Sequence, residues 1–340
     1  MKVIQIGVGG FGAYWLRILG EYPGIELAAL VDVDADALSE AALLAGVAEA
    51  HCFQELEKAL ERVTADILVC VSPPHFHRQH TTAAMKAGLD VICEKPLAID
   101  MEDALAMARA AQETGRLMTV SQNYRYRPVT WTMQKLVAGG EIGEIGQISL
   151  DFYKGWYFDS NDFRRTMPQP LISDMGIHHF DLLRFITGLG AVSVRGESWN
   201  PPWSKNKGDT STNLTFILEN GARFAYSASW CAQGNFTDWN GNWLIEGDRG
   251  SLHYRSSALT LNHADDRYQV QDSHPLPPVG PPLLDQAYIL ADLIAARQEK
   301  RQPQTSIFDN LNSLAMVTAA REAACSGEQT QILTFDEMLD

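Results

Sequence analysis

Apolar and polar residues alternate in blocks along the first 120 residues of the chain. Short β-branched and aliphatic runs are separated by longer stretches of helical composition, two of which end at Gly46 and Gly88. Strands are predicted at residues 2–6, 25–31, 67–71 and 91–93, and helices at residues 13–19, 35–45, 54–62 and 77–87. Strands that alternate with helices are typical of a parallel, doubly wound sheet.

The pattern changes after residue 121, where strand-like segments follow one another with few helices between them. They cover residues 145–153, 192–197, 210–218, 222–230 and 243–246. Asn220-Gly221 separates two of them and readily adopts the positive φ angles of a tight hairpin turn. A proline-rich stretch, residues 275–282, indicates an extended connector leading to two closing helices at about residues 284–298 and 308–325.

These patterns predict an α/β protein with two domains. Residues 1–121 would form the domain with the doubly wound parallel sheet. Residues 122–340 would form a second α/β domain, whose large and mostly antiparallel sheet carries helices on one face.

Charge and composition narrow the classes of function. The 340 residues have a formal net charge of -15 and no basic stripe, which argues against a nucleic-acid partner. No apolar run approaches the roughly 20 residues that span a bilayer, and residues 1–6 lead into glycines rather than a signal-peptide cleavage site. We therefore expect a cytoplasmic protein with no membrane partner. The scattered cysteines lack CxxC spacing and are expected to be reduced.

A glycine-rich turn follows the first predicted strand. Gly7-Val8-Gly9-Gly10-Phe11-Gly12 fits G-x-G-x-x-G, in which glycines allow a tight turn and close approach of the backbone to a pyrophosphate. The motif alone also fits a simple turn. Asp32, at the end of the second strand, favours the cofactor interpretation because its carboxylate can accept hydrogen bonds from ribose hydroxyls. Since Asp32 would repel a 2′-phosphate and Val33 offers no cation, NAD is favoured over NADP.

Two further segments follow strands of the first domain, where loops line the ligand crevice of a doubly wound sheet. Ser72-Pro73 follows the strand at 67–71, and His77 opens the next helix; from the pattern alone, His77 fits a capping or packing residue better than a ligand contact. Glu94-Lys95-Pro96 follows the strand at 91–93. Lys95 can stabilise a developing alkoxide and take part in proton transfer, although a solvated surface lysine fits the position equally well.

The segment from Asp174 to Asp181 is predicted to open a helix in the second domain. Asp174 and His178 are four positions apart and share a helix face, so both can reach one substrate hydroxyl. A histidine, whose unperturbed pKa is about 6.5, suits the general base that removes the hydroxyl proton, while Asp174 orients the substrate or the imidazole.

Two alternatives for this segment stay open. Asp174 also fits a helix N-cap, and His178, His179 and Asp181 are residue types that ligate metals, although we assign no metal ligand. On a helix His179 points about 100° away from His178, and it is predicted to be a packed or interface residue.

Together these motifs resemble the Gfo/Idh/MocA oxidoreductase family. The resemblance covers nearly the whole chain, and it rests on the glycine motif, Ser72-Pro73 with His77, Glu94-Lys95-Pro96, Asn123-Tyr124-Arg125 with Pro128, and Asp174-x-Gly176-x-His178-x-x-Asp181. It implies an NAD-binding Rossmann domain, and a substrate-binding α/β domain with an open-faced sheet through which homodimers or homotetramers associate. Substrates in such a family are carbohydrate-type, namely sugars, polyols or inositols.

By position, the resemblance assigns roles to individual residues. Lys95 looks like the family's catalytic lysine, His178 like its acid/base and Asp174 like its substrate-binding carboxylate. Implied cofactor contacts besides Asp32 and the glycine motif are Ser72, Pro73, His77, Glu94 and Lys95; implied substrate contacts are Asn123, Arg125, Asp174 and His178. The chain departs from the family where Gln169-Pro170 replaces a frequent Gly-Gly pair, in a loop that borders the substrate.

Trp156 is a further substrate candidate, because aromatic faces suit the C–H faces of sugar rings. It lies in the loop at residues 154–157 after a predicted strand, whereas packing is the favoured role of the other tryptophans in this domain. Arg164-Arg165 is more typical of a solvated or ion-paired surface pair than of a carboxylate receptor, so no acidic sugar is assigned.

The leading hypothesis is an NAD-dependent dehydrogenase that oxidises a secondary hydroxyl of a sugar, polyol or inositol-type substrate, with Lys95 and His178 handling the proton. One alternative is an enzyme that reduces bound NAD transiently during a redox-neutral glycoside cleavage or elimination. Another is a non-catalytic sensor of sugars or dinucleotides. Lys95, Asp174 and His178 are all present, which argues against the sensor.

Overall fold

The computed structural model describes residues 1–156, 158, 162–334 and 337, and the chain divides into two compact units. The first unit comprises Met1–Asn123 and Leu283–Leu311, and the second comprises Tyr124–Pro282 and Asn312–Asp340. The predicted boundary at residue 121 lies close to the first division, but the return of Leu283–Leu311 to the first unit was not anticipated. In the described part of the chain, no helix is both long and apolar enough to cross a membrane.

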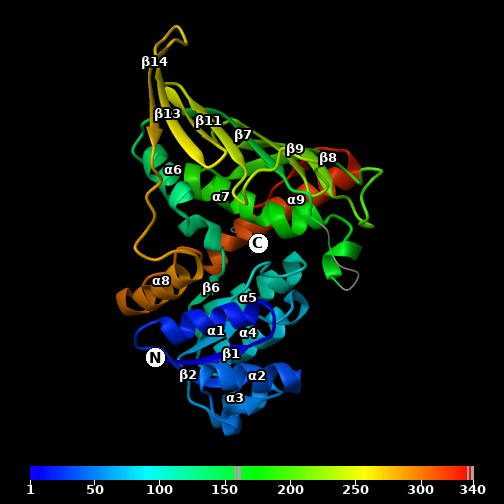
Figure 1. Ribbon diagram of the computed structural model, residues 1–340, viewed down its shortest axis with the longest axis vertical. Coiled ribbons are helices and arrows are strands. Elements are labelled where there is room, and N and C mark those ends of the chain that lie inside the picture. The colour runs from blue at the N-terminus through cyan, green and yellow to red at the C-terminus, as the bar shows by residue number, and fades with distance from the viewer. Residues whose placement is uncertain (157, 159–161, 335–336, 338–340) are drawn as a thin grey trace. The chain divides into compact units, whose positions relative to one another are not determined.

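The first unit contains the predicted parallel sheet, with its described strands in the order β3-β2-β1-β4-β5-β6 (Figure 1). The strands are β1 (Lys2–Ile6), β2 (Glu26–Val31), β3 (Cys52–Phe53), β4 (Ile67–Cys70), β5 (Asp90–Cys93) and β6 (Met118–Val120). The helices are α1 (Phe11–Glu21), α2 (Ala35–Ala45), α3 (Leu56–Arg62), α4 (His77–Lys86), α5 (Met101–Thr114) and α8 (Asp285–Glu299). The alternation thus continues through α5 and β6, beyond the last strand that the pattern predicted.

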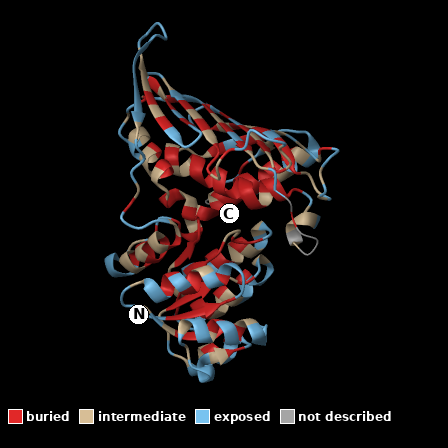
Figure 2. Ribbon diagram, in the orientation of Figure 1, coloured by how far each residue is buried: buried red, intermediate tan, exposed pale blue. Residues whose placement is uncertain are grey.

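The central strands of this sheet are buried on both faces (Figure 2). Val3, Ile4, Leu68 and Ile92 have no exposed surface, which explains why β1, β4 and β5 are mainly apolar rather than alternating. The strand order reverses between β1 and β4, and ligands bind outside the carboxyl ends of the strands at such a switch point. The glycine motif, Ser72 and Glu94 all follow strands at this end of the sheet.

Residues 283–311 join the first unit through specific contacts. In α8, Arg297 forms ion pairs with Asp66 at 3.2 Å and with Asp90 at 3.3 Å. The hydroxyls of Thr119 and Thr305 lie 2.8 Å apart, and the Val120 amide donates to the Thr305 carbonyl. Ion pairs and hydrogen bonds therefore attach residues 283–311 to the parallel sheet.

The second unit contains a sheet whose described strands run in the order β14-β13-β12-β11-β7-β10-β9-β8-β15. The strands are β7 (Ile145–Tyr153), β8 (Ala191–Trp199), β9 (Ser211–Leu218), β10 (Arg223–Ser229), β11 (Asn242–Gly247), β12 (Gly250–Arg255), β13 (Ala258–Ala264), β14 (Val270–Leu276) and β15 (Thr330–Gln331). The β7–β10 pair is parallel and the other pairs are antiparallel. A mostly antiparallel sheet is therefore confirmed.

Helices α6 (Pro128–Ala138), α7 (Ile177–Thr187) and α9 (Ile307–Ser326) lie along one face of this sheet, as predicted (Figure 1). The hairpin at Asn220-Gly221 is confirmed, with Gly221 at φ 85°. Strands β12 to β14 were not predicted. Pro275 belongs to β14 rather than to a connector, and an edge strand tolerates proline because one side of its backbone lacks a partner strand.

Candidate functional site

The glycine motif forms the turn between β1 and α1. Gly7 has φ 83°, and a Cβ there would lie 2.6 Å from the carbonyl carbon of Val71, while a Cβ on Gly12 would lie 2.2 Å from the Gly7 carbonyl oxygen. Gly10, the N-cap of α1, offers no side-chain cap, and no atom outside the turn lies within 4 Å of where its Cβ would be. No side chain therefore caps the start of α1, where the Gly12 and Ala13 amides donate to the Gly9 and Gly10 carbonyls. The N-terminus of a helix favours an anionic group.

Asp32 at the end of β2 faces this turn. Its carboxylate accepts hydrogen bonds from the Val8 amide at 2.9 Å and from the Asp34 amide at 3.0 Å. Val33 beside it is 83% exposed and brings no positive charge. The helix terminus without a side-chain cap and the adjacent half-buried carboxylate fit the pyrophosphate and ribose of a dinucleotide.

Glu94 connects the end of β5 to α1. Its carboxylate accepts from the Trp15 indole N–H at 2.8 Å and from the Lys95 amide at 3.1 Å. Burial raises the pKa of Glu94, while the hydrogen bond from Trp15 and the charge of Lys95 act in the opposite direction. The helix that begins at the glycine motif and the loop that carries Lys95 are therefore held by one carboxyl group.

His77 joins the loops after β4 and β5. Its side chain is buried, with Nε2 2.8 Å from the Ser72 carbonyl and Nδ1 3.0 Å from the Leu97 carbonyl. The Ser72 hydroxyl lies 3.0 Å from Nδ1 of His80. These contacts favour a positioning role for His77 and Ser72, and their direct contact with a cofactor stays a prediction.

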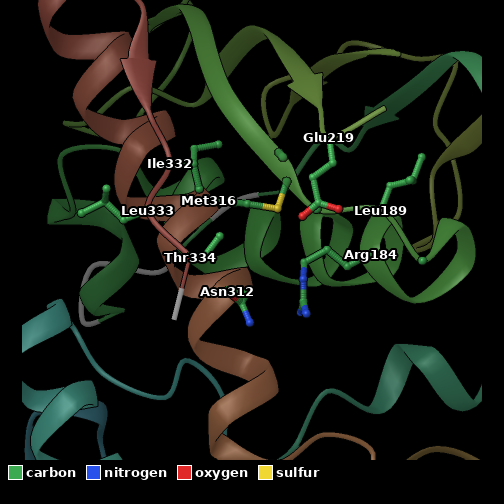
Figure 3. A pocket seen from close by; sticks show the side chains of 11 residues that line it. Arg184, Leu189, Glu219, Asn312, Met316, Ile332, Leu333 and Thr334 are labelled. Carbon is green, nitrogen blue, oxygen red and sulfur yellow. The ribbon is translucent and has the colours of Figure 1, made fainter. Parts of the chain in front are cut away.

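The second unit has a pocket of about 210 Å³, which the predicted residues do not line. Its lining includes Arg184, Glu219 and Asn312, whose side chains Figure 3 shows beside Met316. Arg184 also donates to the Ser313 hydroxyl at 2.8 Å. The pocket is therefore separate from the Asp174 and His178 positions considered next.

Asp174 lies in a π-helical turn, Leu171–Gly176, directly before α7. Its interpretation as an N-cap is wrong, because Pro170 and Gly176 occupy the caps of these two segments and neither cap has a side-chain hydrogen bond. Instead, Nε of Arg164 donates to the Asp174 carboxylate at 2.7 Å. Arg164 is thus ion-paired, as the sequence favoured. The π-helical turn that carries Asp174 is also of interest, because such turns are frequent at functional sites.

His178 belongs to an aromatic stack that the sequence did not predict. Its ring is parallel to that of Tyr124, with centroids 4.0 Å apart, and the guanidinium carbon of Arg127 lies 3.3 Å from the same tyrosine centroid. Both groups cannot occupy one face at these distances, so they lie on opposite faces of Tyr124. Arg127 also donates to Asn240 at 3.1 Å, which holds the outer member of the stack in place.

The packed role predicted for His179 is confirmed. Its side chain is fully buried, with Nδ1 3.0 Å from the Tyr226 hydroxyl and Nε2 3.3 Å from the Trp239 carbonyl. Burial lowers the pKa of His179 to about 3, and the charge of Arg127 acts in the same direction. His179 is therefore a neutral core residue rather than a partner of His178.

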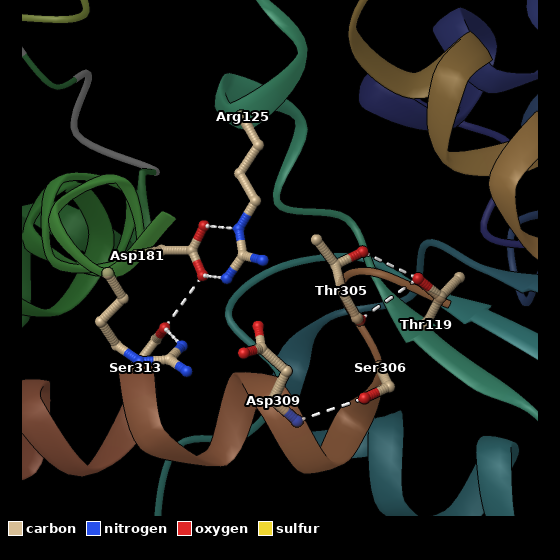
Figure 4. Close-up of polar contacts among 8 residues, drawn as sticks. Thr119, Arg125, Asp181, Thr305, Ser306, Asp309 and Ser313 are labelled. Atoms are coloured by element: carbon tan, nitrogen blue, oxygen red, sulfur yellow. Dashed lines mark hydrogen bonds and ion pairs between the residues drawn. The ribbon is translucent and has the colours of Figure 1, made fainter. Parts of the chain in front are cut away.

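Asp181 pairs with Arg125 inside the second unit (Figure 4). Two bonds join the guanidinium and the carboxylate, at 2.6 Å and 2.5 Å, and the Ser313 hydroxyl donates to the same carboxylate at 2.9 Å. Both charged residues are buried. Arg125 therefore anchors α7, and its predicted contact with substrate stays untested.

Asn123 and Trp156 complete the predicted set, and Gln169 marks the departure from the family pattern. The Asn123 amide donates to Asp285 at 3.0 Å, so it fastens the start of α8. Trp156 is 49% exposed and meets Trp239 edge-on, which leaves ring surface for a ligand; its neighbour Tyr157 lies outside the described residues. Gln169 is buried and donates to the Arg321 carbonyl at 3.3 Å.

Comparison with known families identifies both halves of this arrangement. Residues 1–122 match the model of the oxidoreductase family with an NAD-binding Rossmann fold, and residues 130–253 match the GFO/IDH/MocA C-terminal domain. The chain belongs to the GFO/IDH/MocA oxidoreductase family.

Individual relatives agree with this assignment. The chain is 27% identical to an uncharacterised Sinorhizobium fredii protein, over 98% of this chain and 96% of that one. It is 24% identical to a D-apiose dehydrogenase of Paraburkholderia graminis, over 98% and 90% of the two chains. An Agrobacterium radiobacter oxidoreductase, solved with NAD⁺, L-tartaric acid and magnesium, shares the fold with a TM-score of 0.85 at 22% identity, covering 98% of each chain.

Proposed function

We propose that this protein is an NAD-dependent dehydrogenase that oxidises a secondary hydroxyl of a sugar, polyol or inositol-type substrate. The observation that carries the proposal is the N-terminus of α1, which has no side-chain cap and lies beside Asp32, together with Lys95 in the loop that Glu94 holds against the same helix. The D-apiose dehydrogenase relative, which matches along 98% of this chain, supports the carbohydrate class.

NAD, when bound, supplies the hydride acceptor. In the proposed reaction, His178 removes the hydroxyl proton at an imidazole nitrogen while Lys95 stabilises the developing alkoxide. Asp174 orients the substrate by accepting a hydrogen bond from a hydroxyl. One hydride and one proton leave the substrate, and a ketone or a lactone remains.

The Tyr124 stack limits rotation of the His178 ring, and the ion pair with Arg164 limits movement of the Asp174 carboxylate. Both contacts keep a reacting group in one orientation before the substrate arrives. Such preorganisation lowers the entropy that must be lost in the transition state.

The first experiment follows the NADH absorption band with purified protein, NAD or NADP, and a panel of aldoses, polyols, inositols and glycosides. Growth of NADH equal to the ketone or lactone formed is the expected result. NADH that stays bound while a glycosidic bond breaks would instead establish the redox-neutral alternative, and tight NAD binding without turnover on any substrate would favour the sensor.

Variants then test the assigned residues. Lys95→Met and His178→Asn should each lower kcat by about 10²–10⁴-fold with NAD affinity nearly unchanged, whereas Lys86→Met on the exposed face of α4 should not. Wild-type rates in either site variant would contradict its assignment.

The cofactor preference is tested at Asp32. Asp32→Ala should weaken NAD binding far more than NADP binding, because it removes the acceptor for the ribose hydroxyls together with the charge that repels a 2′-phosphate. Asp36→Ala, one turn away in α2, serves as the charge-matched control. Equal losses for both cofactors would show that the ribose contact lies elsewhere.

A further inference from the structure

Three ligating side chains gather on the hairpin formed by β13 and β14, in the second unit. His263 on β13 lies directly opposite Asp272 on β14, and His274 follows two residues later. Opposite residues of an antiparallel pair share a face, and so do alternate residues of one strand. His263, Asp272 and His274 therefore project from the same face of the hairpin.

The distances between these groups are close to those of a coordination shell. Nδ1 of His263 lies 2.8 Å from one carboxylate oxygen of Asp272, and Nε2 of His274 lies 3.5 Å from the other. One ligand atom from each residue lies within 4.8 Å of the other two. Ligands about 2.0–2.1 Å from a tetrahedral ion are roughly 3.3 Å apart, so side-chain rotations alone bring all three onto one ion.

We propose that His263, Asp272 and His274 form a binding site for one divalent transition-metal ion, with Zn²⁺ as the best match. Two imidazoles and one carboxylate suit Zn²⁺ and its neighbours in the first transition row, whereas Mg²⁺ and Ca²⁺ select all-oxygen sites. Three protein ligands leave a fourth position for water. This site is independent of the proposed dehydrogenase activity.

Glu141 adds the outer contact that metal-bound histidines commonly have. Its carboxylate lies 3.7 Å from Nε2 of His263, on the side of the ring away from Asp272. When Nδ1 of His263 binds the ion, its Nε2–H points towards Glu141, and such a carboxylate orients the ring and strengthens the ligand. The loop after α6 thus contributes to a site that is otherwise confined to one hairpin.

The surroundings allow an ion to enter. The side chains of His263, Asp272 and His274 are 34%, 47% and 56% exposed, so the ion reaches them directly from water. The chain's net charge of -15 also raises the local concentration of cations. The cluster of Cys70, His77 and Cys93 in the first unit is a weaker candidate for a metal site. Its three residues are fully buried, and both ring nitrogens of His77 already contact carbonyl oxygens.

Calorimetric titration of the full chain with Zn²⁺, after treatment with a chelator, tests the proposal. Wild type should bind one equivalent at this site, and His263→Ala, His274→Ala and the near-isosteric Asp272→Asn should each weaken that binding by more than about 100-fold. Glu141→Gln should weaken it by about 10–100-fold. His253→Ala removes an exposed histidine of the neighbouring strand β12 and should leave binding unchanged.

Co²⁺ spectra identify the ligands. The expected complex shows visible d–d bands without the near-ultraviolet charge-transfer band that a thiolate ligand gives. The proposal is overturned if wild type shows no saturable binding, if the hairpin variants bind as well as wild type, or if a thiolate band shows that the ion occupies a cysteine site. Thermal unfolding of each metal-free variant, expected to match wild type, separates loss of a ligand from loss of the fold.

Discussion

The two units hold their candidate residues by different means. In the first unit, the turn at Gly7–Gly12 depends on backbone conformation and on close backbone contacts, and Asp32 attaches to it through amide groups. In the second unit, Asp174 and Asp181 are each held by an arginine from another segment. Backbone-determined geometry requires a local motif, whereas side-chain pairs can be assembled from distant positions.

This difference predicts how each region responds to substitution. A site built on backbone geometry should be sensitive to one added methyl group. A site built on buried charge pairs should be sensitive to the loss of one partner, but should tolerate replacement of both.

The largest effect is expected at the pair of Arg125 and Asp181. Asp181→Asn should lower the free energy of unfolding by about 3–5 kcal/mol, because it leaves a buried guanidinium without its counter-charge. Urea denaturation of the variants measures the loss. The exposed pair of Arg301 and Glu299 provides the control, and Glu299→Gln should cost no more than about 1 kcal/mol.

Replacing both partners sharpens this test. The double variant Arg125→Met, Asp181→Leu should recover most of the lost stability, since apolar pairs of similar volume often match a buried ion pair. A double variant as unstable as Asp181→Asn would mean that packing around α7, rather than uncompensated charge, sets the cost.

A smaller effect, of about 1–3 kcal/mol, is expected for Gly12→Ala. Alanine favours helices by about 1 kcal/mol over glycine, so helix propensity alone predicts stabilisation. The contact of a Cβ with the Gly7 carbonyl at 2.2 Å should reverse that sign and weaken NAD binding by shifting the turn. Gly20→Ala is the matched control in the same helix, where a Cβ meets nothing within 4 Å and should stabilise. Stabilisation by both variants would show that the turn shifts to accommodate the added methyl group at little cost in free energy.

The smallest effect concerns the pH dependence that Glu94 introduces. Burial raises its pKa in the folded chain, so its contribution to stability is fully present below the unfolded pKa, near 4.5, and is lost as the pH rises through the folded value. Measured from pH 4 to pH 8, the stability of wild type relative to Glu94→Gln should therefore fall as the pH rises. A difference that is constant with pH would mean that this carboxyl group has an ordinary pKa.

The sequence was sufficient for the features that local physics determines. The parallel sheet, the turn at Gly7–Gly12 and the Asn220-Gly221 hairpin follow from hydrophobic period and from glycine positions. The contacts of Asp174 with Arg164, and of His178 with Tyr124 and Arg127, are set by the packing of separate segments, and no spacing rule encodes them. Only the presence of Tyr124 in the Asn123-Tyr124-Arg125 motif hinted at the stack.

Strand β14 escaped prediction for a related reason. The exposed edge strand β14 has no buried side to impose an alternating pattern, and it includes Pro275 in a proline-rich stretch that reads as a connector. The proposed metal cluster could not be predicted from the sequence either, because His263 and Asp272 become neighbours only when β13 and β14 pair.

The return of Leu283–Leu311 to the first unit has a consequence for how the chain is made. A ribosome releases the parallel sheet early, but α8, whose Arg297 neutralises Asp66 and Asp90, emerges only after eight of the nine described strands of the second sheet, β7 to β14, have been synthesised. The sheet that is translated first therefore lacks this helix until most of the second unit has been translated. A fragment ending at residue 123 would be an incomplete domain, even though the match to the NAD-binding family model ends at residue 122.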